Sequence, residues 1–357
     1  MNCYADLSLT AQTTYAETME VVQAQTLMRS IAHLNGSFAK KRVKGSIYWY
    51  FQFRDIDQSV RQIYIGPDSE RIQHLMKIAD SPAQSHPNAL ARAAIEMGCA
   101  RILPKHFSVI RRLSEYGFFK AGGVLIGTHA FIAMGNLLGV SWADGARTQD
   151  VDFAHAGKNI SIGLPADIKV DIHAAIDSLE MGLLPIQSFK GGAGATYLNP
   201  AQPELRIDFL TAIGREGDEP FNFEKLNIAL QALKFMEFSL ESTTQATLLS
   251  RDGALLVNIP SPIRYGLHKL IVHGERGEAF RTKATKDILQ SAALISWYVN
   301  HEPDRLRATL EDLMERGPGW RKRAKQGIDA VIKLDPTLGP HLLDRTAKKG
   351  VSRVRGH

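Results

Sequence analysis

Residues 124–153, VLIGTHAFIAMGNLLGVSWADGARTQDVDF, decide the fold of this chain. The segment begins with an apolar run at 124–126 that is typical of a buried strand and stops at Gly127 and Thr128. Apolar side chains then recur every three to four residues, which predicts a helix up to about residue 138. A glycine lets the backbone approach a phosphate closely, and a helix N-terminus favours anions. We therefore expect Gly127 and Thr128 to form a phosphate-binding turn.

The same stretch ends in an acidic strand, in which Asp150 and Asp152 alternate with Val151 and Phe153. Successive side chains of a strand point to opposite faces, so both carboxylates should share one face while both apolar side chains enter the core. Two neighbouring carboxylates repel each other unless a cation lies between them. Oxygen ligands of this kind suit Mg²⁺. The pair therefore predicts half of a magnesium site.

A third acid lies much later in the chain. Residues 188–211 are predicted to form a hairpin whose second strand carries Asp208. In that strand Ile207 and Phe209 face one side, whereas Arg206 and Asp208 face the other. Two metal ions held by three such acids can bind a nucleoside triphosphate and activate an attacking hydroxyl. The combination of the phosphate-binding turn, the acidic pair and the later acid is more specific than any of its parts.

The composition is that of an ordinary globular protein. The chain has 357 residues, of which 44% are hydrophobic and 22% charged. No apolar run is long enough to span a membrane, and no basic region followed by an apolar stretch opens the chain. Cys3 and Cys99 are far apart, which argues against a disulfide framework or a structural zinc site. We expect no membrane association and a cytoplasmic location.

The formal net charge of +6 favours a polyanionic partner. Lys40, Lys41, Arg42 and Lys44 form a basic cluster just before residues 46–66, whose aromatic and β-branched runs predict a β-hairpin. Aromatic rings among basic residues can stack nucleic-acid bases. The alternative, which the sequence favours, is an aromatic hairpin packed on its own helix, with the cations forming a solvated surface.

The remaining elements follow from hydrophobic periodicity and turn residues. The turn sequence 251–253 predicts a hairpin between 243–250 and 254–260. Helices are predicted for residues up to about 34, from about 70, and for 89–116, 172–183, 223–240 and 262–343. Residues 346–357 are predicted to be a disordered basic tail.

With these residues in place, the chain resembles a known family. The order of a glycine with a hydroxyl residue, Asp-x-Asp and a later strand aspartate is similar to that of the nucleotidyltransferase fold shared with polymerase beta. The motifs GTHAF, LGVSW, RTQDVDFA, LRIDFLT, HKLIVHGER and KATKDILQ resemble a bacterial nucleotidyltransferase-fold family related to AbiEii and MenT-type toxins. The resemblance covers about Tyr48 to Ala293.

The resemblance implies an α+β fold, with a mixed sheet flanked by helices, an N-terminal helix and hairpin region and a helical C-terminal region. The expected divisions are an N-terminal region (1–88), the nucleotidyltransferase core (89–215), a hairpin plus helical region (216–345) and the tail (346–357). Thr128 stands where the wider fold has serine, and the separation of Gly127 from Asp150 is longer than usual, which leaves the geometry of Thr128 against the metals open.

The resemblance also implies roles for individual residues. Asp150 and Asp152 would be magnesium ligands, and Asp208 would be the third acid, nearest the acceptor hydroxyl and able to act as its base. The residues expected to hold the triphosphate are Gly127, Thr128, Arg147 and Lys269. For Lys269 a structural ion pair with Asp287 is an equal alternative. His129, beside the turn, is expected to be a packed polar group rather than a ligand.

The sequence hypothesis is thus a magnesium-dependent nucleotidyltransferase, with two Mg²⁺ ions, that moves a nucleoside monophosphate from an NTP to an acceptor hydroxyl and releases pyrophosphate. An RNA 3′ end is the favoured acceptor, and a toxin or defence role with an antitoxin or operon partner follows by analogy. The alternatives are a non-catalytic nucleotide- or nucleic-acid-binding module of the same fold and a metal-dependent nuclease.

Overall fold

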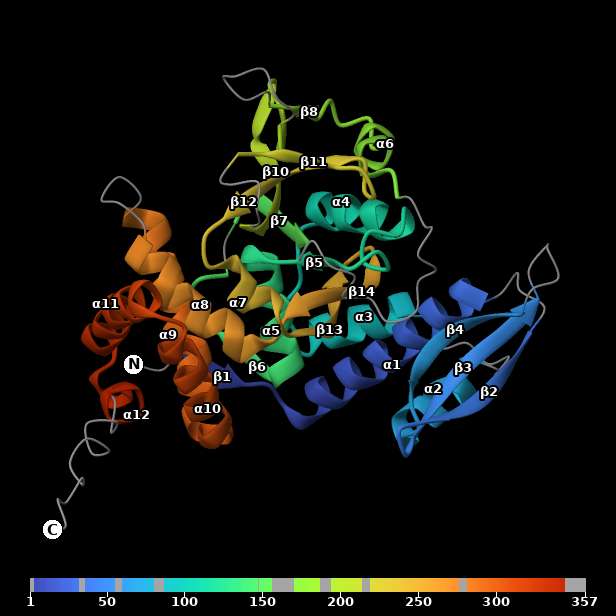
Figure 1. Ribbon diagram of the computed structural model, residues 1–357, viewed down its shortest axis with the longest axis horizontal. Helices are drawn as coiled ribbons and strands as arrows, with labels where there is room; N and C mark the ends of the chain where they lie inside the picture. Colours follow the sequence, from blue (N-terminus) through green and yellow to red (C-terminus); the bar gives the residue numbers. More distant parts are fainter. Residues whose placement is uncertain are drawn as a thin grey trace, which may run out of the picture. The chain divides into compact units, whose positions relative to one another are not determined.

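The computed structural model describes residues 3–31, 36–54, 60–79, 87–146, 148–155, 170–186, 194–213, 219–275 and 281–343 (Figure 1). The chain divides into two compact units. The larger unit comprises Ala5–Ser141 and Ala146–Pro260, and the smaller comprises Met1–Tyr4, Trp142–Gly145 and Ser261–His357. Strands and helices are both abundant in the larger unit, which confirms the α+β class.

A mixed sheet forms the centre of the larger unit, with strand order β11-β12-β10-β7-β5. Its strands are β5 (Gly123–Leu125), β7 (Asp150–His155), β10 (Gln202–Ala212), β11 (Phe221–Phe223) and β12 (Ile228–Leu233). Strand β10 runs parallel to β7 and to β12, while β5 and β11 run antiparallel to their neighbours. Strands β8 (Leu184–Pro185) and β9 (Thr196–Asn199) extend the sheet beside β10.

Aromatic packing sets the faces of β7 and β10. Val151 and Phe153 are completely buried, as are Ile207 and Phe209 on the neighbouring strand. The Phe153 and Phe209 rings stack with centroids 5.4 Å apart and an interplanar angle of 16°. Full burial of a large apolar side chain stabilises by roughly 1.5–3 kcal/mol. A one-residue slip of either strand would expose these rings and bury the carboxylates, so the alternation holds the acids away from the core.

Helices and a hairpin complete the larger unit. The helices are α1 (Leu9–Ile31), α3 (Pro87–Glu96), α4 (Pro104–Glu115), α5 (Gly127–Leu138), α6 (Ile172–Asp177) and α7 (Met236–Leu240). The predicted hairpin is present as β13 (Thr243–Ser250) and β14 (Gly253–Pro260), and β1 (Tyr4–Asp6) pairs with β6 (Val140–Trp142). Helix α5 follows β5 directly, as residues 124–138 predict.

The aromatic hairpin is part of a three-stranded sheet with order β2-β3-β4. Strands β3 (Ser46–Arg54) and β4 (Val60–Pro67) were expected, whereas β2 (Gly36–Val43) was not, because the basic residues hide its β-pattern. Helix α2 (Glu70–Ala79) follows. Residues 55–59, between β3 and β4, lie outside the described part of the chain, as does the predicted tail.

The described part of the smaller unit is helical beyond Ser261, as predicted. Its helices are α8 (Pro262–Glu275), α9 (Arg281–His301), α10 (Pro303–Glu315), α11 (Pro318–Leu334) and α12 (Gly339–Leu342), with a 3₁₀ turn at Pro336–Leu338. Across the described ranges of the whole chain, none of the helices has both the length and the apolar character to cross a membrane.

Two predicted helices were wrong. Residues 223–240 do not form one helix: Ile228–Leu233 is strand β12, which pairs with β10, and only Met236–Leu240 is helical. The apolar run fits a buried strand as well as a helix, and pairing with β10 decides between them. The helix predicted for 172–183 ends at Asp177, since Glu180 and Gly182 have φ of 52° and 63° and Leu184 joins a strand.

Candidate active site

The three acids lie on one face of the central sheet. In the parallel register of β7 and β10, Asp208 lies opposite Asp152, and Arg206 lies opposite Asp150. Paired strands run about 4.8 Å apart and alternate side chains share a face, so all four side chains project from the same face. Each of the three acids is partly exposed. The structure thus brings together the acids that the sequence separates by more than fifty residues.

Gly127 backs directly onto one of these acids. Its φ is +63°, a conformation that L side chains rarely adopt, and a Cβ there would overlap Oδ2 of Asp152 and lie 2.9 Å from its Cγ. The backbone N–H of Ile126 donates to the Asp152 carbonyl at 2.9 Å, which fixes the strand end against β7. Because Gly127 opens α5, the Asp152 carboxylate lies at the favourable end of the helix dipole.

The next two residues of α5 are buried. Thr128 is 4% exposed and His129 1% exposed. Nε2 of His129 lies 2.9 Å from Nδ1 of His106 on α4, so the prediction that His129 is a packed polar group is confirmed. Burial lowers the pKa of His106, with Lys105 adding to the effect and Asp150 opposing it. The charge of Asp150 therefore acts on the imidazole of His106.

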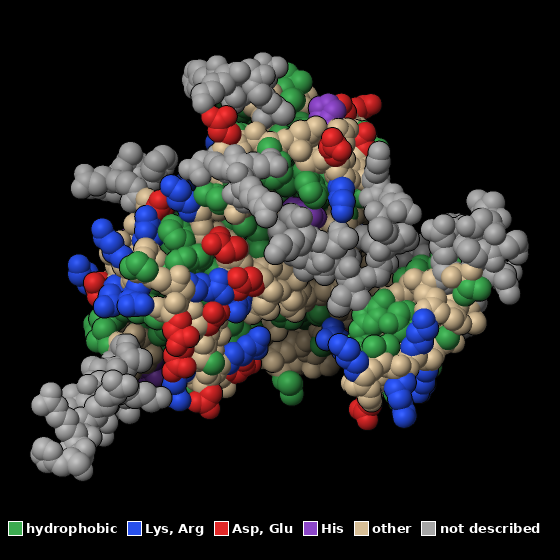
Figure 2. All heavy atoms as spheres, in the orientation of Figure 1, with side chains coloured by type: hydrophobic (Ala, Val, Ile, Leu, Met, Phe, Trp, Pro, Cys, Tyr) green, Lys and Arg blue, Asp and Glu red, His purple; other side chains and the backbone are tan. Residues whose placement is uncertain are grey.

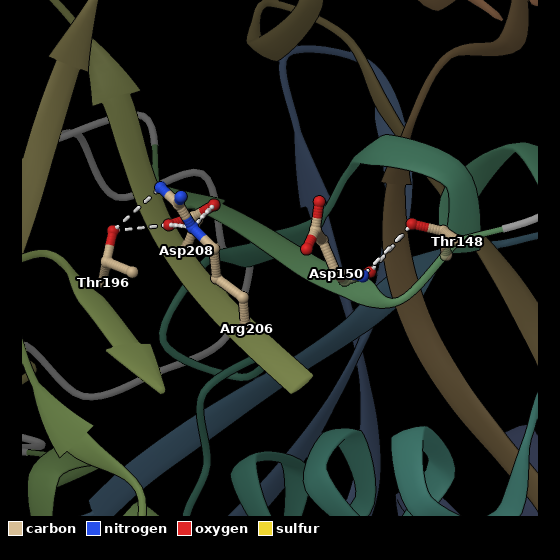
Figure 3. A network of polar contacts seen from close by, with 5 residues as sticks. All are labelled: Thr148, Asp150, Thr196, Arg206 and Asp208. Atoms are coloured by element: carbon tan, nitrogen blue, oxygen red, sulfur yellow. Dashed lines mark hydrogen bonds and ion pairs between the residues drawn. The ribbon is translucent and has the colours of Figure 1, made fainter. Parts of the chain in front are cut away.

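A polar network holds the third acid (Figure 3). Nε of Arg206 donates to Asp208 with 2.9 Å to each carboxylate oxygen, and Oγ1 of Thr196 donates to Oδ1 at 2.5 Å. Arg206 Nη2 also donates to Oγ1 of Thr196 at 3.4 Å. The sequence reasoning assigned no role to Arg206 or Thr196. The alternation Arg-x-Asp carried the signal for the arginine. The predicted hairpin at 188–211 contains Thr196, but only the register of β9 with β10 places Thr196 opposite Asp208.

A threonine, Thr148, fixes the start of strand β7. The backbone N–H of Asp150 donates to Oγ1 of Thr148 at 3.2 Å, within a turn that precedes β7. In Figure 3 the carboxylate of Asp150 projects from β7 toward the same side as the Arg206–Asp208 pair on β10. Asp150 is therefore positioned by its own backbone, with its carboxylate presented at the open face.

The donor set has the chemistry of a site for a hard divalent cation. Three aspartates on one sheet face offer only carboxylate oxygens, which Mg²⁺ prefers, and the missing side chain at Gly127 leaves room for Asp152. In the present conformation, no three His, Cys, Asp or Glu side chains of the described ranges are grouped closely enough to hold a metal ion. The carboxylate of Asp208 is turned to Arg206. It would have to exchange the guanidinium for a cation to complete such a site.

The two predicted cationic contacts have different outcomes. Arg147 lies outside the described residues. Lys269 is on α8 of the smaller unit, where its Nζ lies 2.7 Å from Oδ1 of Asp287 on α9 and 5.1 Å from the ring centroid of Tyr265. The side chains of Lys269 and Asp287 are 15% and 4% exposed. This is the ion pair given as the alternative for Lys269. Its predicted contact with a triphosphate stays a prediction.

Known proteins that are similar to this chain indicate its family. A solved structure of an antigenic nucleotidyltransferase-like protein from Paracoccidioides brasiliensis is 15% identical, with 68% of this chain and 94% of that chain covered and a TM-score of 0.37. The comparison with curated proteins found no match. A family model described as nucleotidyltransferase matches residues 105–315, which contain all three acids and the Gly127 turn. As this match spans more than half of the sequence, the chain belongs to that nucleotidyltransferase family.

Proposed function

We propose that this chain is a magnesium-dependent enzyme that transfers a nucleoside monophosphate from an NTP to an acceptor hydroxyl. One observation carries the proposal: Asp208 is in register with Asp152 across two parallel strands, beside the helix start at Gly127. Carboxylates gathered next to a helix N-terminus offer a cation-binding face and an anion-binding turn side by side. A triphosphate with its counterions requires both.

The roles follow from the positions of the residues. The backbone at Gly127 and the hydroxyl of Thr128 would bind the triphosphate, and Asp150 and Asp152 would hold Mg²⁺. In the transfer, the acceptor oxygen forms a bond to the α-phosphorus while the bond from that phosphorus to the bridging oxygen of the β-phosphate breaks, and pyrophosphate leaves. The proton of the acceptor hydroxyl passes to the Asp208 carboxylate, which acts as the general base. Bound Mg²⁺ would stabilise negative charge on the phosphoryl oxygens.

Arg206 has two possible uses in this scheme. In the present conformation it neutralises Asp208. Its side chain is 46% exposed, so it can leave the carboxylate without crossing the core. A guanidinium released next to the acids is suited to bind phosphate oxygens. We propose that Arg206 exchanges Asp208 for the triphosphate when substrate and cation bind.

The favoured acceptor is an RNA 3′ end, because the chain carries a net charge of +6 and a hydroxyl is required. A toxin or defence role, with a partner protein that silences the activity, is the corresponding biological proposal. Induced expression of the wild-type chain should then arrest growth of a bacterial host, and the Asp152→Asn variant should not. Equal growth with both would count against this role.

One observation favours a second candidate, a non-catalytic nucleotide-binding module. The pairing of Asp208 with Arg206 is the arrangement expected of a carboxylate with a structural function. Such a module would bind NTP without consuming it. The two candidates differ in whether pyrophosphate is released.

The test is an incubation of the purified chain with each α-labelled NTP, Mg²⁺ and total RNA. Label transfer to RNA supports the proposal, RNA cleavage indicates the nuclease alternative, and NTP binding without either indicates the module. Asp150→Asn and Asp152→Asn should abolish transfer while the fold survives. Asp252→Asn, the same change at an exposed acid in the β13–β14 turn, is the matched control and should retain full transfer.

A second variant tests the phosphate-binding turn. Thr128→Ala should raise the NTP concentration needed for half-maximal transfer, with little change in the rate at saturation, because ground-state binding of the triphosphate is weakened. If the dependence on NTP concentration is unchanged, Thr128 has no part in holding the substrate.

A further inference from the structure

The β2-β3-β4 sheet has two unlike faces. Strand alternation puts Trp49 and Phe51 on one face. Phe51 is 6% exposed and packs edge-on against Phe38, with ring centroids 5.3 Å apart. A Cβ at Gly66, which pairs with Trp49, would lie 2.8 Å from the side chain of Ile72 on α2. Helix α2 therefore covers this face, as the packed-hairpin alternative requires.

The opposite face carries Tyr48, Tyr50 and Tyr64 with Lys41, and we call these four residues the tyrosine face. The ring of Tyr64 lies 6.0 Å from that of Tyr48 and 5.4 Å from that of Tyr50. Nζ of Lys41 lies 5.3 Å from the centroid of the Tyr50 ring. All three tyrosines are partly exposed and Lys41 is exposed. Aromatic surface is thus left open to solvent, next to a cation.

Cations border this face. Lys40, Lys41, Arg42 and Lys44 lie on the edge strand β2 or in the turn that follows it, and all four are exposed. Lys41 alternates to the tyrosine face, whereas Lys40 alternates to the other face and pairs there with Asp68 at 3.2 Å. Residues 36–54 and 60–67 contain no Asp or Glu. Figure 2 shows Lys and Arg side chains around a group of hydrophobic side chains over this sheet. The region is complementary to a polyanion with flat apolar parts.

We propose that the tyrosine face is a docking surface for single-stranded RNA. Unpaired bases would stack on Tyr48, Tyr50 and Tyr64, and the phosphates would contact the lysines. Gln52 and Gln62, paired across β3 and β4 on the same face, can donate to and accept from the 2′-hydroxyl that distinguishes RNA from DNA. Duplex RNA keeps its base faces stacked on one another and cannot use the rings.

A purely structural explanation makes different predictions. Lysines on an edge strand discourage edge-to-edge aggregation, and cross-strand aromatic pairs stabilise a sheet by roughly 0.2–1 kcal/mol each. On that explanation, loss of a tyrosine ring would lower stability and leave RNA binding unchanged. Binding and stability therefore have to be measured on the same variants.

The experiment measures binding of the full chain to a labelled single-stranded oligoribonucleotide of about 12 nucleotides by fluorescence anisotropy, in EDTA and without NTP. Tyr50→Leu should weaken binding about 5- to 150-fold, the range expected for loss of one stacked base, while Tyr50→Phe should bind within about threefold of the wild type. Tyr116→Leu, at an exposed ring beyond α4, is the matched control and should bind normally. Circular dichroism of each variant reports whether the sheet is intact.

The salt dependence of RNA binding measures how much the lysine charges contribute to the affinity. Lys41→Ala should reduce the slope of log affinity against log salt by about 0.7, whereas Lys322→Ala on α11 should leave it unchanged. Normal binding by a folded Tyr50→Leu variant would overturn the proposal. So would equal affinity for DNA of the same sequence, or for the RNA duplex.

Only the further step, that the bound strand is the acceptor, rests on the proposed transfer. RNA binding is measured here without metal or nucleotide, so it can succeed where transfer fails. In that outcome the docking surface stands and the proposed enzymatic function falls. Conversely, RNA labelling that is unaffected by Tyr50→Leu would retain the enzyme and remove this surface from its acceptor site.

Discussion

Gly127→Ala is the sharpest test of the candidate active site. The substitution adds one methyl group to a residue with φ of +63°, and that methyl group would overlap Oδ2 of Asp152. Apolar contacts are optimal at about 3.5–4.0 Å, whereas the added carbon would lie 2.9 Å from Cγ of Asp152. The carboxylate therefore has to retreat by about 1 Å or rotate away from β10.

Two magnitudes follow. An alanine in the left-handed region costs about 1–2 kcal/mol of folding free energy relative to glycine. A displacement of a catalytic group by about 1 Å can cost about 100-fold in rate, which corresponds to roughly 2.7 kcal/mol in the activation free energy. We expect a modest loss of stability and a loss of about 100-fold or more in nucleotidyl transfer.

The assay compares two variants of the same helix. Gly139 ends α5 with φ of +74°, and the three atoms nearest to a Cβ there all belong to the Gln12 side chain. Gly139→Ala therefore imposes a similar backbone strain without touching an acid. Urea denaturation measures the stability of each variant, and label transfer from NTP at saturating Mg²⁺ measures activity.

The expected result is similar destabilisation of both variants, with loss of transfer only in Gly127→Ala. If Gly127→Ala retains full transfer, Asp152 does not act where we place it. If both variants lose transfer in proportion to their instability, the effect is one of folding and the contact of Gly127 with Asp152 has no catalytic meaning.

Three further predictions concern buried or paired charges. Lys269→Met and Asp287→Asn should each lower the free energy of unfolding by about 3 kcal/mol, because each leaves a buried charge without that partner; in urea denaturation the double variant should lose less than the sum. Burial lowers the pKa of His268 to about 3, so the unfolded chain binds a proton that the folded chain does not once the pH falls below about 6.5. The free energy of unfolding should therefore fall by about 2 kcal/mol between pH 8 and pH 5 because of His268. In urea denaturation, the free energy of unfolding of His268→Leu should depend less on pH. Arg206→Gln should strengthen Mn²⁺ binding about fivefold in an electron spin resonance titration, since a half-exposed ion pair with Asp208 is worth at most about 1 kcal/mol; weaker binding would contradict the exchange.

Much of the fold could be predicted because its signals are local. Residues 124–138 form β5 and α5 as their periodicity indicates, and the hairpins at 46–67 and 243–260 follow from turn residues and β-branched runs. The helix predicted for residues 223–240 was wrong because the local signal is ambiguous there. The hydrophobic periodicity of a short apolar run cannot distinguish a buried strand from a helix. Pairing of β12 with β10 determines that this run is a strand.

The candidate site divides in the same way. Which residues share a face of β7 or β10 was determined by the sequence alone, because alternation is a property of the single strand. That Asp152 and Asp208 are neighbours, that Arg206 holds Asp208, and that Lys269 pairs with Asp287 were decided only by tertiary structure. Register between distant strands depends on how Phe153 and Phe209 stack in the shared core, and no local pattern specifies that packing.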